Sequence, residues 1–289
     1  MNEVPPTALR PEMIQRTVEG LQGLSCAYAV VHKCIDAMED AQITGRQIEQ
    51  ILAADQGLAA RVLKLANSAY FGISGRVSTL TMAVGVIGHR RLRLMLERIL
   101  ISEMLGILKA EGELARSIRE FGVIAGAVSR DLSAATWVGD PEEMLMAGLL
   151  HNVGDLVLAS LFPAQLRQIR EEAARAGQAE AEKTVLGFES GIVGGWLLDA
   201  WLFPPIYAAA CRHSRAPLEY SDAPDLLHRL CVIHVAASVT RSFVEGLDSR
   251  AAFGAVQSDA LAVLEAGPEI IVSLYEELPG RIDRTRGVL

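Results

Sequence analysis

Apolar residues recur at helical spacing along almost the whole chain, and this periodicity limits the possible folds more than any other feature. Between Ile48 and Ala66 the apolar positions fall mainly on one face, with a break near Asp55, a residue type that caps helices. Similar stripes run through 92–99 and 113–134, and Asp140-Pro141 is a typical helix start. Because neither strand alternation nor a hairpin signal interrupts this pattern, the sequence predicts an all-α protein.

Composition supports the helical prediction and excludes one class of function. Hydrophobic residues make up 51% of the 289 positions but aromatic residues only 5%, so Leu, Ala, Val and Ile must fill the core. The formal net charge is −8. Proteins that grip nucleic acid by its phosphates usually carry a basic excess or stripe, so nucleic acid is not an expected partner.

The cysteines and the apolar runs indicate a cytoplasmic protein. Four cysteines occur, at Cys26, Cys34, Cys211 and Cys231, and none forms a CxxC pair, which is typical of core thiols in a reducing compartment. The N-terminus lacks the basic and apolar regions of a secretory signal. Uninterrupted apolar runs stay short of the roughly 20 residues that cross a bilayer, so we expect no membrane span.

Five short motifs in series resemble the HDOD domain family. They are DQGLAARVLKLANSA at 55–69, AVGVIG at 83–88, AGLLHNVG at 147–154, GGWLLDAWLFP at 194–204, and Arg212-His213 followed by Pro217. The resemblance extends from about residue 20 to about residue 240, in the order that the family shows. It implies an all-helical fold and a role in bacterial signalling or regulation, often without demonstrated catalysis.

The resemblance also implies how the chain is organised. HDOD domains are relatives of the HD metal-dependent phosphohydrolases, so we expect an N-terminal helical bundle packed on a degenerate HD-like bundle. Residues 1–19 would form an extension, 20–110 the N-terminal subdomain, 111–245 the HD-like subdomain and 246–289 a C-terminal helical extension. GLLHNVGDL, at 148–156, would be the central helix of the HD-like bundle.

The metal ligands of an HD hydrolase do not carry over to this chain. The positions that match a first His, the Asp of the HD pair and a late Asp fall on or near Phe121, Asn152 and Ala237. Phe and Ala offer no donor atom, and Asn offers a neutral carbonyl oxygen where a dication favours a carboxylate. The sequence therefore predicts no metal and no other cofactor.

Three alternatives stay open around His151. Asp155 would share a face with His151 if the helix continued, so that these two residues and His213 could form an atypical phosphohydrolase metal site. A hydrogen-bonded, structural His151 is the simpler interpretation. In a third hypothesis the vacated pocket binds a nucleotide second messenger, with His151, Asn152, Asp155, Arg212 and His213 as candidate ligand-binding residues.

Two further groups are candidate binding residues. Arg90, Arg91 and Arg93 could meet an anion or an acidic partner, although an exposed helix face with an Arg93–Glu97 pair is the simpler interpretation. Asn67 and Tyr70 could belong to a recognition loop, or could satisfy backbone groups and anchor the loop.

The sequence as a whole predicts a non-catalytic regulatory protein. The HDOD-like motifs and the C-terminal helices use nearly all of the chain, so we expect it to act in trans on a signalling protein or through a small ligand. A monomer and a homodimer are both compatible with the sequence.

Overall fold

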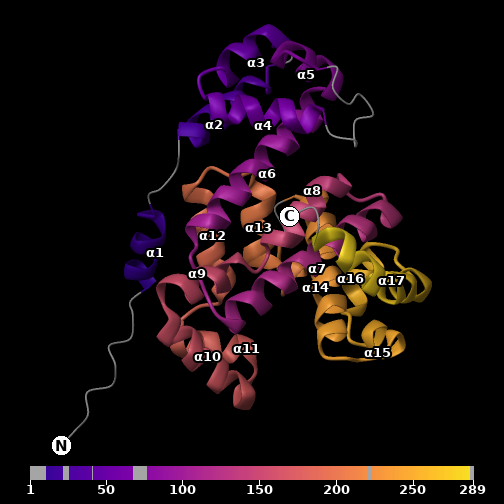
Figure 1. Ribbon diagram of the computed structural model, residues 1–289. Coiled ribbons are helices and arrows are strands. Elements are labelled where there is room, and N and C mark those ends of the chain that lie inside the picture. The colour runs from indigo at the N-terminus through magenta and orange to yellow at the C-terminus, as the bar shows by residue number, and fades with distance from the viewer. Residues whose placement is uncertain (1–10, 22–25, 41, 68–76, 221–222, 287–289) are drawn as a thin grey trace, which may run out of the picture. The chain divides into compact units, whose positions relative to one another are not determined.

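The structure is a computed structural model that describes residues 11–21, 26–40, 42–67, 77–220 and 223–286. Within these ranges the secondary structure is helical, and no strand occurs, which confirms the predicted all-α class. The chain divides into two compact units, Gln22–Ile107 and a second unit made of Met1–Leu21 with Leu108–Leu289. Figure 1 shows the helices of both units along the chain.

The described residues of the unit Gln22–Ile107 form five helices. They are α2 (Cys26–Ala37), α3 (Gly45–Leu52), α4 (Gln56–Ala66), α5 (Leu80–Ile87) and α6 (His89–Ile107). Thr44 forms a capping box at the start of α3, and the carboxylate of Asp55 accepts a hydrogen bond from the Leu58 amide at 2.8 Å. The predicted break near Asp55 is therefore confirmed, with its physical cause.

The larger unit centres on α8 (Pro141–Leu150) and the two long helices α7 (Glu113–Thr136) and α14 (Pro224–Val244), which pack against one another. Asp140 caps α8 through the Glu142 and Glu143 amides, as the Asp-Pro pair predicts. The surrounding elements are α1 (Pro11–Glu19), α9 (Val153–Leu161), α10 (Pro163–Ala176), α11 (Gln178–Leu186), α12 (Ser190–Ala200), α13 (Pro205–His213), the 3-10 helix η2 (Pro217–Glu219), α15 (Ser249–Gly254), α16 (Ser258–Val263) and α17 (Pro268–Arg286).

Glycines allow the helices of the larger unit to approach closely. A Cβ at Gly122 or Gly126 of α7 would lie 2.7 Å from a carbonyl oxygen of α8. Gly154 of α9 and Gly191 of α12 lie closer still to the backbones of α12 and α13. At these contacts the backbones of neighbouring helices touch, and this fixes the distance between the helices.

The GLLHNVGDL segment departs from its predicted structure. It was expected to form one central helix, but α8 ends at Leu150 and α9 begins at Val153, so His151 and Asn152 form a junction. The prediction of a single helix was wrong because apolar residues continue on both sides of the break. The Asp155 amide bonds back to the Asn152 carbonyl at 3.1 Å, which starts the new helix.

One stretch of the described chain has the length and composition of a membrane span. It is Pro141–Leu161, which contains α8 and α9, and 72% of its most apolar window is buried inside the protein. The core helices of soluble proteins have the same character, so this is weak evidence for a membrane. The thiols of Cys34, Cys211 and Cys231 are free and buried.

Candidate functional site

His151 lies at the C-terminal end of α8 and turns its ring back onto its own helix. Its Nδ1 lies 2.6 Å from the Gly148 carbonyl oxygen. Because a carbonyl can only accept, this contact places the proton of the neutral ring on Nδ1. Burial lowers the pKa of His151 to about 4, and the charges of Arg215 and Arg241 act in the same direction. The imidazole is therefore neutral at ordinary pH.

Asn152 fastens the junction between α8 and α9 to α7. Its Nδ2 donates a hydrogen bond to the Ile118 carbonyl at 2.8 Å, and a Cβ at Gly122 would lie 2.9 Å from its Oδ1. An ionised Asp at this position has no proton to donate to that carbonyl. The Asn152 amide thus makes a hydrogen bond that the ionised carboxylate of an HD pair could not make.

The two other positions that lack a metal ligand are filled by apolar groups. The Phe121 ring lies beside the His151 ring, with centroids 5.7 Å apart. Ala237, on α14, is buried. The donor atoms near His151 therefore do not fit the metal of an HD hydrolase. In the described part of the chain, no group of three or more His, Cys, Asp or Glu side chains is arranged to hold a metal ion.

Arg212 and His213 of α13 contact residues other than Asn152. The Arg212 guanidinium forms an ion pair with Asp199 of α12 and lies over Gly195. The His213 ring packs edge-on against Tyr220, with centroids 5.2 Å apart. The polar groups of Asn152 and Arg212 thus have separate partners on α7 and α12, and they do not point at one shared ligand position.

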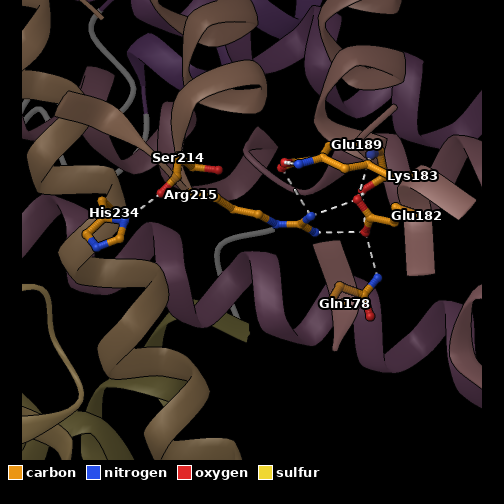
Figure 2. A network of polar contacts seen from close by, with 8 residues as sticks. Gln178, Glu182, Lys183, Glu189, Ser214, Arg215 and His234 are labelled. Carbon is orange, nitrogen blue, oxygen red and sulfur yellow. Dashed lines mark hydrogen bonds and ion pairs between the residues drawn. The ribbon is translucent and has the colours of Figure 1, made fainter. Parts of the chain in front are cut away.

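Asp155 belongs to a cluster of polar and charged side chains that no motif in the sequence indicates. It lies in the first turn of α9, where its carboxyl is hydrogen-bonded to Ser190 of α12. Burial raises its pKa, and the charge of Glu182 adds to the effect. Glu182 in turn pairs with Arg215, as Figure 2 shows. Asp155 therefore faces acidic and hydroxyl groups of α11 and α12, and no described contact links it to His151.

The candidate arginines lie in the unit Gln22–Ile107. The Arg93 guanidinium pairs with Glu97 at 3.0 Å, as predicted, and also with Glu39. Glu97 is buried while the Arg93 side chain is 37% exposed, so the pair lies at the border between the core and the solvent-facing side of α6. Arg90 and Arg91 are exposed at the start of α6.

Asn67 is a structural clamp at the end of α4. Its amide nitrogen donates to the carbonyls of Leu63, at 3.0 Å, and Val77, at 2.7 Å, while its Oδ1 accepts from the Val77 amide. It thereby ties the end of α4 to Val77, which supports the structural interpretation of this residue. Tyr70, its predicted companion, lies outside the described residues.

Asn67→Ala is expected to lower the free energy of unfolding by about 2 kcal/mol, because three partly buried hydrogen bonds lose a partner. Chemical denaturation measures the change. Ser78→Ala is the matched control, since the Ser78 side chain is exposed, and its effect should stay within about 0.5 kcal/mol. Equal effects of the two substitutions would show that Asn67 is no clamp.

Comparison with known proteins gives one family and several similar folds. The family model of the HDOD domain matches residues 24–217. An uncharacterized protein of Treponema pallidum is 26% identical over 216 residues, which are 73% of this chain and 40% of that protein. The chain thus spans well under two thirds of the length of the curated relative that it matches.

Solved structures share the fold at low sequence identity. A candidate phosphohydrolase from Shewanella amazonensis is 21% identical with a TM-score of 0.65, over 96% of this chain and 98% of that one. An HDOD domain protein of unknown function from Geobacter sulfurreducens has a TM-score of 0.60 at 17% identity, over 94% and 98% of the two chains. A candidate signal transduction protein from Marinobacter aquaeolei has a TM-score of 0.65 at 19% identity, over 96% and 64%. At these identities the likeness is one of fold.

Proposed function

This chain belongs to the HDOD domain family, and from that premise we propose that it is a non-catalytic signalling protein that acts by binding a partner. The observation that carries the proposal is the role of Asn152. Its amide donates to the Ile118 carbonyl. The residue at the position of the metal-binding Asp of a hydrolase is therefore used to hold two helices together. With His151 bonded to Gly148 and Phe121 beside it, the three groups form a closed packing unit.

The same contacts favour a partner protein over a nucleotide as the bound species. A nucleotide that used Asn152, Arg212 and His213 would have to displace the contacts with Ile118, Asp199 and Tyr220. A panel of nucleotides, read by melting temperature, separates the two possibilities. We expect no shift with any nucleotide, and a saturable rise with one of them would favour the nucleotide-sensor hypothesis.

Hydrolysis is tested on the purified protein with Mn²⁺, Fe²⁺ or Ni²⁺ and a chromogenic phosphodiester. The proposal predicts turnover no greater than that of His151→Ala, which lacks the surviving imidazole of the HD pair. Metal-dependent turnover that disappears in His151→Ala would overturn the non-catalytic function and favour an atypical phosphohydrolase.

Trp137 supports a binding role, because neither burial nor backbone conformation explains a tryptophan at this position. It ends α7 in the left-handed conformation, with φ at 58°, and its side chain is 92% exposed. Leu202 is similar, with φ at 50° and 67% of its surface exposed. An exposed Trp in a conformation that favours glycine is a candidate binding residue, because Trp is a frequent hot spot of protein interfaces.

Trp137→Gly is expected to raise the free energy of unfolding by about 1 kcal/mol, because glycine adopts the left-handed conformation without strain and little packing is lost. Thermal or urea unfolding measures the change, and Leu202→Gly should shift it in the same direction. A loss of stability in both variants would mean that these side chains serve the fold and would remove them from the proposal.

A further inference from the structure

The first helix of the larger unit, α1, is held in place by few side chains. It packs against α12, and Figure 1 shows it alongside that helix. Ile14 and Val18, one helical turn apart, are fully buried, and Leu21, just after the helix, is half-buried. The charged side chains of α1 are exposed, and Met13 is 55% exposed. α1 therefore contacts the rest of the larger unit through one apolar edge.

Polar contacts do not reinforce this edge. Within the described ranges, the side-chain hydrogen bonds of α1 stay inside the helix: Gln15 donates to Glu19 at 2.8 Å, and the Thr17 hydroxyl donates to the Met13 carbonyl at 2.8 Å. α1 has nine residues, and isolated helices shorter than roughly 12 residues are only marginally stable in water. The helical form of α1 thus depends on its apolar contact with α12.

The side of α12 that α1 covers, here called the α1 face, does not need α1 in order to form. Gly191, Gly194 and Gly195 face α9 and α13, which hold α12 by close contact, so α1 covers a different side of the helix. Between Ser190 and Leu198, α12 carries no charged side chain. The α1 face is therefore a preformed apolar surface on a well-supported helix.

The contact between α1 and the α1 face resembles the binding of a peptide more than the packing of a core helix. Burial of two aliphatic side chains stabilises α1 by an amount comparable to the entropy lost when its residues are ordered, so α1 can leave the surface by local opening. Ile14, Val18 and Leu21 have the i, i+4, i+7 spacing by which an amphipathic helix anchors itself on another protein.

We propose that the α1 face of α12 is a docking site for a short amphipathic helix, which α1 occupies in cis. A helix of a signalling protein that presents apolar residues at the spacing of Ile14, Val18 and Leu21 would bind by displacing α1. α1 thereby limits access to the site. The identity of this competitor rests on the proposed partner-binding function, whereas the docking of α1 does not.

The test is a binding titration with a labelled synthetic peptide of residues 11–21, read by fluorescence anisotropy. In Ile14→Asp the protein's own α1 carries a charge that the apolar site cannot bury, so α1 is released and the peptide is expected to bind. Wild-type protein should bind the peptide at least about tenfold more weakly, because its own α1 competes at a millimolar effective concentration. Protein concentrations up to about 1 mM suffice, since docking in cis requires a dissociation constant below that effective concentration.

Two controls separate the apolar edge from a general effect of charge. Met13→Asp places the same charge on the exposed side of α1 and should bind the peptide as weakly as wild type. A peptide that itself carries Ile14→Asp should bind none of the three proteins. No binding of the unchanged peptide to Ile14→Asp, or equal binding to Ile14→Asp and to either wild type or Met13→Asp, would overturn the proposal. The proposed function would survive that result, because the metal, hydrolysis and nucleotide tests do not involve α1.

If Ile14→Asp does not fold, amide hydrogen exchange of the wild-type protein decides. About 1 mM of the peptide, labelled with ¹³C so that its mass differs from that of α1, should speed exchange of the α1 amides at least about threefold, because displaced α1 loses its protection. The amides of α7 should be unaffected. An unchanged exchange rate of α1 would show that α1 is an integral part of the fold and would overturn the proposal.

Discussion

Gly154→Ala is expected to lower the free energy of unfolding by about 3 kcal/mol or more, at the upper end of what overpacking causes. A Cβ at this position would overlap the Ser190 carbonyl oxygen, and would lie 2.9 Å from the Ser190 carbonyl carbon and 3.0 Å from the Gly194 amide nitrogen. Those atoms are backbone, so no side chain can rotate to make room. Relief requires α9 to move away from α12.

The matched control is Gly254→Ala at the end of α15, where an added Cβ would have no atom within 4 Å. Its effect should be neutral or stabilising by up to about 1 kcal/mol, because alanine is the better helix former. Urea unfolding of the two variants beside wild type gives both numbers. A Gly154→Ala protein as stable as Gly254→Ala would contradict the close approach of α9 and α12.

The stability of the protein is expected to fall as pH drops from about 6.5 to about 4, with His151 as one identifiable cause. Its pKa is about 4 in the folded state, because burial disfavours the charged ring, and near 6.5 when unfolded. Between these values the unfolded chain binds a proton that the folded chain does not, so acidification favours unfolding. The full difference is about 3 kcal/mol, from about 1.36 kcal/mol per pKa unit.

His151→Gln isolates this effect, because glutamine does not titrate while Glu182 and the other acids titrate in both proteins. The stability difference between wild type and His151→Gln should be constant above pH 7 and should change in favour of the variant toward pH 4. Unfolding curves across this range measure it. Parallel pH profiles of the two proteins would show that His151 is not buried as a neutral ring.

Much of the fold follows from local signals in the sequence. Asp55 and Asp140 cap helices where the sequence predicts them to begin, since a side-chain oxygen at each of these positions satisfies an amide of the first turn. The motif series identified the family, which the match over residues 24–217 confirms. Short helices such as α15 and α16 were not predicted, because six-residue elements are too short for a periodic stripe.

The candidate site was less predictable, because it depends on contacts between residues that lie far apart in the sequence. No proline or glycine follows directly after Leu150 to indicate the end of α8, and the Asn152 side chain at this junction bonds to Ile118, 34 residues earlier in the chain. Arg215 and Glu182 are 33 residues apart, and each looks like an ordinary surface charge in sequence. The cluster of Gly191, Gly194 and Gly195 was the available signal that α12 is closely packed on both sides.

If the HD position of this chain is a packing unit, as proposed, the purified protein should hold almost no transition metal. Elemental analysis for Mn, Fe, Ni and Zn, after expression in medium supplemented with these metals, should find far less than one ion per chain, since a neutral amide and one committed imidazole make a poor site. About one ion per chain, lost in His151→Ala, would contradict the account.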